Sequence, residues 1–280
     1  MVTESLNFHK FIMFYQLWHY AHAVEFRLQM LNELALIRRQ NKAFPRRLWL
    51  QTLRRPTSTE DWINFLRFLA PDEPLHLIDV GANDGSWSEG FISIFPNTAL
   101  TAFEPVPATF AQLQARYGER PGSQLFNCAL SNKSGRLTIN LGEESTFASF
   151  EEFEDHIGQL REKSITGSEE VTIETLDSFA LEIDPGRKTV LKIDVQGHEE
   201  EALEGAAALL AQVDVVLCET SFAVEYKNRQ PSFSRVAELL RPANLFPIGF
   251  QEFGRQASTL AIERDVLFVK DSLLDMIFER

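Results

Sequence analysis

The sequence predicts an α/β fold, in which a mostly parallel, doubly wound sheet carries helices on both faces. From residue 75 onward, short apolar runs alternate with helical stretches, which is typical of repeated β-α units. The first apolar run ends in a turn with two glycines, and the second ends in one acidic residue. Glycines and an acid in these places are typical of a nucleoside-binding site on such a sheet.

The individual elements follow from this alternation. Apolar runs predict seven strands, at 75–80, 99–104, 124–129, 189–195, 213–219, 246–250 and 265–270. Four helices are predicted between them, at about 85–95, 107–117, 198–211 and 231–241. The last run allows an antiparallel strand that closes an edge of the sheet.

The interval 131–189 interrupts the alternation, because it is too long for an ordinary crossover. Within it, residues 135–140 and 170–173 predict short extra strands, and the polar stretch 143–150 lies between them. Long insertions near strand ends often cover a site, so we predict that this interval contains a lid.

The first 56 residues are predicted to be a helical extension, followed by the main domain at 57–280. Apolar and aromatic residues recur at steps of three and four over 5–42, which indicates one long helix or two in tandem. Such a stripe favours packing on the same domain or on a second copy of the chain, so a homodimer is one expectation. A membrane-surface or partner-binding helix is the alternative. The basic residues between Arg38 and Arg55 are interpreted as a solvated face, with binding of an acidic substrate or of lipid headgroups as the alternative.

Composition narrows the class of protein. The 280 residues are 44% hydrophobic, enough to bury a full core, and their formal net charge is -13. An acidic body argues against nucleic acid as a partner, because phosphates dominate that kind of affinity. Cys128 and Cys218 lie in apolar runs and are expected to be buried free thiols. With neither a signal peptide nor a membrane-spanning run recognisable, we expect a cytoplasmic protein.

The segment from Asp79 to Ser86 indicates which nucleoside cofactor is bound. Its pattern is D-x-G-x-N-x-G, whereas a dinucleotide fold needs G-x-G-x-x-G with bare N–H groups for a pyrophosphate. Asp79 and Asp84 would repel a diphosphate but can hold the ammonium of an amino acid, and Glu104 can accept hydrogen bonds from ribose hydroxyls. S-adenosylmethionine has both of these groups, an amino-acid ammonium at one end and ribose hydroxyls in its nucleoside, so it is the predicted cofactor. A nicotinamide-dependent oxidoreductase is the alternative.

Residues just after each strand form the candidate site, because ligands bind beyond the carboxyl ends of such strands. The predicted cofactor-binding residues are Asp79, Gly81, Ala82, Asn83, Asp84, Gly85, Ser86, Glu104, Pro105, Asn127, Ala129 and Asp194.

The segment after the fourth strand brings Asp194, His198 and Glu199 to one rim. Methyl transfer to a hydroxyl needs a base, and we predict that His198, with an unperturbed pKa of about 6.5, and Asp194 are catalytic. In the structural alternative, His198 and Glu199 only begin a helix and Asp194 caps it. A metal held by Asp194, His198 and Glu219 is less favoured, since no pair has a tight ligand spacing, so no metal is expected.

On these motifs the chain resembles FkbM-type methyltransferases, a branch of the class I S-adenosylmethionine-dependent enzymes. The resemblance covers about residues 75–270. It rests on Asp79–Gly85, Phe103–Pro105, Asn127–Leu130, Thr175–Asp177, Leu191–Glu199 and Leu203–Ala206.

That resemblance implies a seven-stranded Rossmann-like sheet and O-methylation of a sugar, glycan or polyketide-like hydroxyl. It also implies that Asp79, Gly81, Asn83 and Glu104 bind the cofactor and that Asp194 lies near the transferred methyl group. Gln196 departs from the Glu of many relatives, which weakens any role for a third carboxylate there. Another acceptor type, or a non-catalytic partner protein with a vestigial site, are the remaining alternatives.

Overall fold

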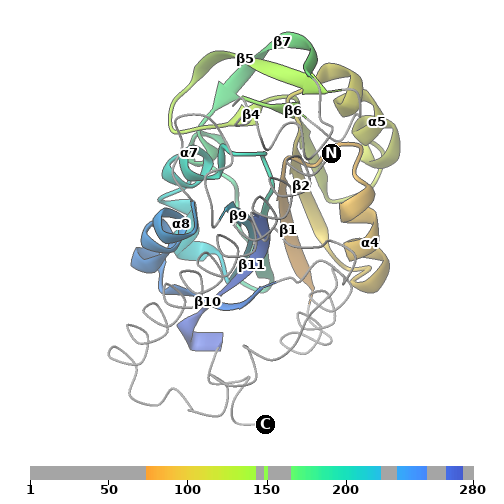
Figure 1. Cartoon of the computed structure of the whole chain (residues 1–280). Coiled ribbons are helices and arrows are strands. Elements are labelled where there is room, and N and C mark those ends of the chain that lie inside the picture. Colours follow the sequence, from red (N-terminus) through yellow and green to blue (C-terminus); the bar gives the residue numbers. More distant parts are fainter. Residues whose placement is uncertain (1–73, 143–147, 151–164, 222–231, 251–262, 274–280) are drawn as a thin grey trace, which may run out of the picture.

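The computed structural model describes residues 74–142, 148–150, 165–221, 232–250 and 263–273, which form two sheets with flanking helices (Figure 1). The strands are β1 (Leu75–Val80), β2 (Ala99–Phe103), β3 (Ser123–Phe126), β4 (Ala129–Leu130), β5 (Gly135–Gly142), β6 (Ala148–Ser149), β7 (Ile165–Glu174), β8 (Lys188–Ile193), β9 (Val215–Ser221), β10 (Leu245–Phe250) and β11 (Glu263–Lys270). The α-helices are α4 (Ser86–Ile94), α5 (Pro107–Tyr117), α7 (Glu199–Glu204) and α8 (Phe233–Leu240). The predicted N-terminal helix, the basic cluster and the boundary at 56 lie outside the described residues.

The main sheet has seven strands in the order β10-β11-β9-β8-β1-β2-β3. All neighbours pair in parallel except β11, which is antiparallel to both β9 and β10. The antiparallel direction of the last strand is therefore confirmed, but β11 lies inside the sheet and β10 forms the edge. The chain builds outward from β1 to β3 on one side and continues with β8 on the other side. The carboxyl ends of β1 and β8 consequently mark the switch point where ligands bind in this kind of sheet.

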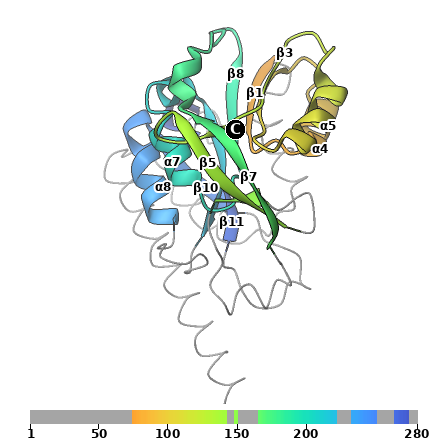
Figure 2. The same ribbon diagram turned by 90° about the horizontal axis from the view of Figure 1, so that it is seen from above.

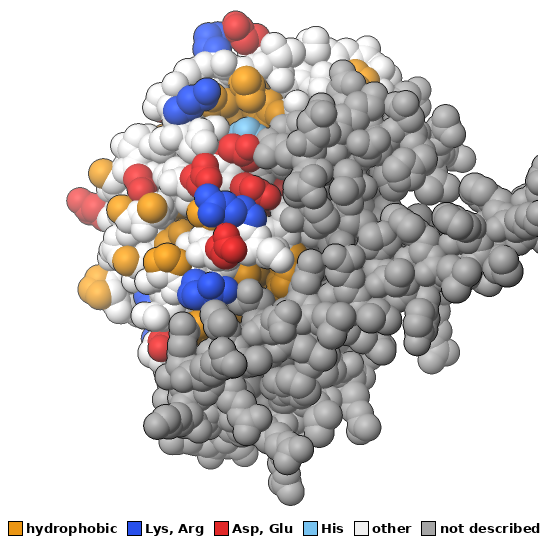
Figure 3. Space-filling model, turned by 60° about the vertical axis from the view of Figure 1, so that its left-hand side comes forward, with side chains coloured by type: hydrophobic (Ala, Val, Ile, Leu, Met, Phe, Trp, Pro, Cys, Tyr) orange, Lys and Arg blue, Asp and Glu red, His pale blue; other side chains and the backbone are white. Residues whose placement is uncertain are grey.

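Both faces of the main sheet are covered, which explains the continuous apolar runs in the sequence. All six residues of β1 are buried. Leu75 and Leu77 pack in one cluster with Phe91 of α4 and Leu113 of α5. Ile78 and Val80 pack in a second cluster with residues of α7 and α8 on the other face. On the face that carries α7 and α8, acidic and basic side chains are interspersed among the described residues (Figure 3).

The predicted insertion forms a second sheet, of four strands in the order β4-β7-β5-β6. Its long antiparallel pair of β5 and β7 extends across the top of the molecule (Figures 1 and 2). The predicted extra strands at 135–140 and 170–173 are confirmed as parts of β5 and β7. The predicted strand 124–129 is wrong at its end, because β3 stops at Phe126 and Ala129 begins β4, which pairs with β7.

The predicted helix 198–211 is also divided in two. Helix α7 ends at Glu204, and a 3-10 turn follows at Leu209–Gln212. The break lies at Gly205, where an added Cβ would be 2.0 Å from the carbonyl oxygen of Ser131. Close approach of the segment after β4 therefore leaves no room for a side chain at position 205, where α7 ends. Among the described residues, no helix is both long and apolar enough to cross a membrane.

Candidate active site

A cavity of about 350 Å³ lies at the carboxyl ends of β1, β2 and β8, with the second sheet forming one wall. Nine predicted site residues line it: Gly81, Ala82, Asn83, Asp84, Ser86, Glu104, Pro105, Ala129 and Asp194. The second sheet contributes Ile139, Ala148 and Phe150. Asp79, Gly85, Asn127 and His198 are not among the residues that line the cavity.

The turn after β1 is shaped by glycine. Gly81 has a φ of 76°, and an added Cβ would lie 1.9 Å from the carbonyl oxygen of Asp194. The amides of Gly81 and Ala82 both donate to the carbonyl of Phe103, each at 3.0 Å. A side chain at position 81 would therefore separate β1 from the segment that follows β8. Gly85, with a φ of 82°, instead faces Tyr117 of α5.

Glu104 is a buried carboxylate in the cavity wall, 5% exposed. Its two oxygens accept hydrogen bonds from the amides of Asn83 (3.0 Å) and Val106 (2.9 Å). Burial raises the pKa of Glu104 to about 7, against the opposing effect of these two hydrogen bonds. The side chain of Asn127 donates to the carbonyl oxygens of Glu104 and Pro105, so it supports the backbone here.

Asp84 lies at the start of α4 and is held there by polar contacts. Its carboxylate accepts hydrogen bonds from the amide (3.0 Å) and the hydroxyl (2.7 Å) of Ser86, and Arg116 is 3.2 Å away. Hydrogen bonds from Ser86, with a smaller contribution from Arg116, lower the pKa of this carboxyl group. Asp84 is therefore an ionised group in the cavity wall.

Lys192 is the most consequential cavity residue that the sequence patterns did not indicate. Its ammonium lies 3.1 Å from Asp79, 3.6 Å from Asp194 and 5.5 Å from the centre of the Trp87 ring. Burial lowers the pKa of Lys192, but the attraction of Asp79 and Asp194 outweighs this effect and raises it overall. Strand alternation could have indicated Lys192, because it precedes Asp194 by two positions, and residues two apart on a strand point to the same face.

Asp79 lies behind this lysine and is completely buried. Its carboxylate accepts a hydrogen bond from the hydroxyl of Ser88 at 2.6 Å as well as from Lys192. The position of Asp79 thus fits a role in fixing Lys192 and the start of α4.

The turn after β8 presents Asp194 to the cavity with 40% of its side chain exposed. The side-chain nitrogen of Gln196 donates to Asp194 at 3.1 Å and to Glu219 of β9 at 2.8 Å. Glu199 holds the backbone of this turn, since one of its oxygens accepts hydrogen bonds from the amides of Val195 and Gly197, each at 3.1 Å. Burial raises the pKa of Glu199 to about 8.

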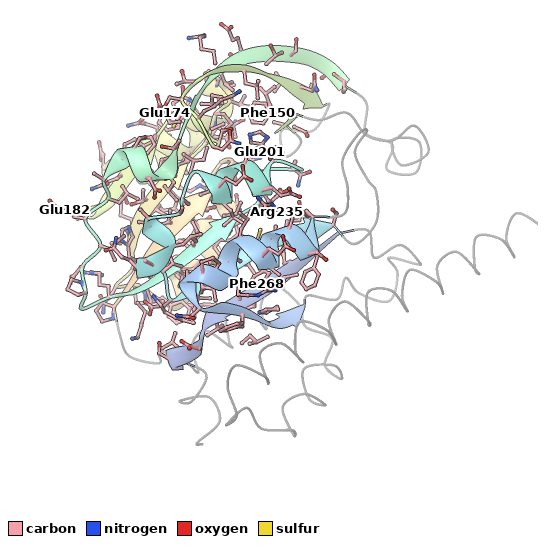
Figure 4. The ribbon with its side chains drawn as sticks, turned by 90° about the vertical axis from the view of Figure 1, so that its left-hand side faces the viewer. Phe150, Glu174, Glu182, Glu201, Arg235 and Phe268 are labelled. Carbon is pink, nitrogen blue, oxygen red and sulfur yellow. The ribbon has the colours of Figure 1, made fainter. Side chains whose placement is uncertain are left out.

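His198 begins α7 and is buried, with 5% of its surface exposed. Its Nε2 is 3.0 Å from the hydroxyl of Ser131, and its ring centre is 4.7 Å from that of Phe150. Glu201, one turn along α7, lies 3.6 Å from Nδ1, and Figure 4 labels both Phe150 and Glu201 beside this helix. His198 therefore lies between Ser131 and Phe150 and does not line the cavity, and its catalytic role stays a prediction. Among the described residues, no group of three His, Cys, Asp or Glu side chains is placed to hold a metal.

The cavity residues fit S-adenosylmethionine. The backbone from Gly81 to Asp84 lines the cavity, and Glu104 offers a buried carboxylate in the same wall. Carboxylates at Asp84 and Asp194 suit the cationic ammonium and sulfonium of this cofactor better than a diphosphate. Together with the strand order, this site defines the class of S-adenosylmethionine-dependent methyltransferases with a Rossmann-like sheet.

The chain belongs to the FkbM methyltransferase domain family, whose model matches residues 79–248. It is therefore an S-adenosylmethionine-dependent methyltransferase of the FkbM type. Membership of this family therefore excludes the two alternative classes, a nicotinamide-dependent oxidoreductase and a non-catalytic partner protein.

Two curated relatives illustrate the family. The 2-O-methyltransferase NoeI of Sinorhizobium fredii is 25% identical over 193 residues, which are 66% of this chain and 79% of NoeI. The hexuronic acid methyltransferase AglP of Haloferax volcanii is 30% identical over 173 residues, which are 60% of this chain and 62% of AglP. Among solved structures, the 1,6-didemethyltoxoflavin-N1-methyltransferase of Burkholderia thailandensis is 14% identical, with a TM-score of 0.41 over 88% of this chain and 89% of its own. The fold assignment above rests on the strand order.

Proposed function

We propose that this enzyme transfers a methyl group to a hydroxyl of a sugar, glycan or polyketide-like small molecule, with Asp194 as the catalytic base. The observation that carries the proposal is the half-exposed carboxylate of Asp194 in the cavity wall, at the switch point of the sheet. Bound S-adenosylmethionine supplies an electrophilic methyl group, so the protein must supply the alignment of the hydroxyl and an acceptor for its proton.

The neighbours of Asp194 suit this role. The Lys192 ammonium lies 3.6 Å away and helps to hold the Asp194 carboxylate at the cavity wall. The Gln196 amide occupies one carboxylate oxygen and leaves lone pairs free for the acceptor hydroxyl. A carboxylate is a weak base, so we expect most of the rate to come from alignment of the reactants, with proton transfer contributing as the new bond forms.

The cofactor side of the cavity is proposed to run along the turn after β1. Glu104 would accept hydrogen bonds from the ribose hydroxyls, and the segment from Gly81 to Ser86 would face the amino-acid end. Pro105 after β2, Asn127 after β3 and Ala129 at the start of β4 would then lie towards the adenine ring of the cofactor.

The relatives support a sugar hydroxyl as the acceptor. One is named as a 2-O-methyltransferase and the other as a hexuronic acid methyltransferase. We therefore favour a sugar or glycan over other acceptor types. A cytoplasmic location, a homodimer through the segment 1–56 and the division of the chain at residue 56 are parts of the same proposal.

Two experiments test the proposal in sequence. Calorimetry with S-adenosylhomocysteine checks the cofactor site without any acceptor. Incubation of the purified enzyme with methyl-labelled S-adenosylmethionine and a metabolite extract, followed by mass spectrometry, then identifies the labelled product. A labelled methyl ether on a sugar supports the proposal, whereas label on nitrogen, sulfur or carbon would refute it.

A further inference from the structure

The side chain of Gln196 bridges two carboxylates from neighbouring strands. Its amide nitrogen lies 3.1 Å from Oδ1 of Asp194, beyond β8, and 2.8 Å from Oε2 of Glu219 on β9. An ionised carboxylate only accepts hydrogen bonds, so the two hydrogens of one amide group serve both partners. The opposite orientation of the amide would bring its oxygen against two acceptors. The chemistry of the partners therefore fixes which end of Gln196 faces them.

The backbone of this turn is held by other groups. Gln196 has a φ of 52°, an uncommon conformation for a residue other than glycine. Its carbonyl accepts a hydrogen bond from the hydroxyl of Ser149 at 2.6 Å, and Glu199 accepts the amides on either side of it. Because none of these three bonds uses the side chain of Gln196, a change of its side-chain amide should leave the turn in place.

Asp194 stands in a predominantly acidic surrounding. Among the residues that the structure describes, Lys192 of β8 is a cation that faces it, and this lysine is shared with Asp79 of β1. The acids near it are Glu219 of β9 and Glu199 of α7, whose own pKa is raised by burial and, in part, by Asp194. Asp265 of β11 adds negative charge on the Lys192 side. A neutral donor at position 196 thus separates two acids that would otherwise repel each other.

We propose that Gln196 is a positioning residue for methyl transfer, whose amide fixes the carboxylate of Asp194 towards the acceptor hydroxyl and keeps it apart from Glu219. This inference rests on the proposed role of Asp194 as the base. Gln196 itself lines the cavity beside Asp194, so the amide also limits how the acceptor can approach.

The variant Gln196→Glu tests the inference, because it replaces the donor by a third carboxylate of nearly the same shape. We expect the acidic limb of the pH profile of kcat to move up by about one pH unit or more, since a like charge disfavours ionisation of Asp194. On that limb, kcat at a given pH should then fall about tenfold, since one pH unit corresponds to a factor of ten. The affinity for S-adenosylhomocysteine should stay within about threefold of the parent value. The matched control is Gln124→Glu on β3, an exposed position outside the cavity, where the limb should not move.

A second readout needs no acceptor and no turnover. Carbon-13 NMR of carboxyl-labelled aspartate, with the Asp194 signal assigned from Asp194→Asn, should show a higher titration midpoint for Asp194 in Gln196→Glu than in the parent enzyme. The variant Gln196→Ala, which removes the donor without adding charge, should raise the midpoint by a smaller amount. An unchanged midpoint of Asp194 in both variants would overturn the inference about Gln196. A raised midpoint in an enzyme that methylates no hydroxyl would support it and refute only the proposed acceptor.

Discussion

The two sides of the cavity are built in different ways. After β1, the proposed cofactor side consists mainly of backbone with positive φ angles, and Glu104 accepts hydrogen bonds from two backbone amides. After β8, the proposed acceptor side consists of side chains that contact one another across strands, with Lys192 between two aspartates and Gln196 between Asp194 and Glu219. In our proposal, the first kind of site binds the cofactor, and the second kind selects the acceptor.

The largest effect is expected where the two sides touch, at Gly81→Ala. The new Cβ would meet the Asp194 carbonyl at 1.9 Å, and the φ of 76° disfavours any side chain. We expect a loss of about 4 kcal/mol in the free energy of unfolding and a more than roughly 100-fold weaker affinity for S-adenosylhomocysteine. Denaturant titration and calorimetry measure these quantities.

Gly90→Ala is the control for this variant, because an added Cβ there meets open space on α4. It should stabilise the protein by about 0.5–1 kcal/mol. If Gly81→Ala behaved like Gly90→Ala, the close contact between the two sides would be wrong.

The next largest effect is expected at Lys192→Met, which removes the charge that links the two sides. Asp79 is completely buried and would keep an unpaired carboxylate, so we expect a loss of about 3 kcal/mol in the free energy of unfolding. Denaturant titration measures it, and the double variant Asp79→Asn/Lys192→Met should recover part of the loss. A loss below about 1 kcal/mol would mean that this pair does not connect the sides.

Asp194→Asn should separate the two sides functionally. We expect kcat to fall about 10²- to 10⁴-fold, the usual range for loss of a general base, while the affinity for S-adenosylhomocysteine changes less than about tenfold. Steady-state kinetics and calorimetry check both parts. Asp184→Asn, in an exposed loop, is the matched control and should retain full activity. Full turnover by Asp194→Asn would remove the base from the proposal.

The contrast between the two sides also explains what the sequence could predict. Gly81 and Glu104 were predictable, because a positive φ and a single acid after a strand leave local patterns in the sequence. Lys192 was missed because its partner Asp79 is more than one hundred residues away in the chain. The same holds for the bridge from Gln196 to Glu219, which exists only once β8 and β9 are paired. The need for glycine at position 205 likewise depends on a distant residue, Ser131, which follows β4.

A smaller effect is expected in the pH dependence of stability and of cofactor affinity, and it tests whether Glu104 belongs to the proposed cofactor side. Its pKa of about 7 lies above the unfolded value of about 4.5, because of burial, so the folded state binds the proton more tightly. This contribution to stability is fully present below about pH 4.5 and is lost as the pH rises to about 7. Ribose hydroxyls prefer the ionised carboxylate, so the affinity for S-adenosylhomocysteine should increase about tenfold between pH 6 and 8.

Glu104→Gln should abolish both pH dependences. Thermal midpoints and calorimetry at several pH values measure them, with Glu119→Gln on the exposed surface after α5 as the control. An unchanged pH dependence in Glu104→Gln would assign the effect to Glu199, whose raised pKa of about 8 lies on the other side of the cavity.

The smallest effect on turnover is expected for substitution of His198. This substitution tests whether the proposed acceptor side includes α7. His198→Gln removes the contact with Ser131 and should cost about 1–3 kcal/mol of the free energy of unfolding, because a buried hydroxyl loses its partner. Since His198 does not line the cavity, kcat should stay within about fivefold of the parent value. Ser131→Ala removes the same contact, and the two losses should not add in the double variant. If His198→Gln lost about 100-fold in kcat while Ser131→Ala stayed active, the imidazole would have a role in proton transfer. The acceptor side would then reach past Phe150, and the boundary between the two sides would have to include α7.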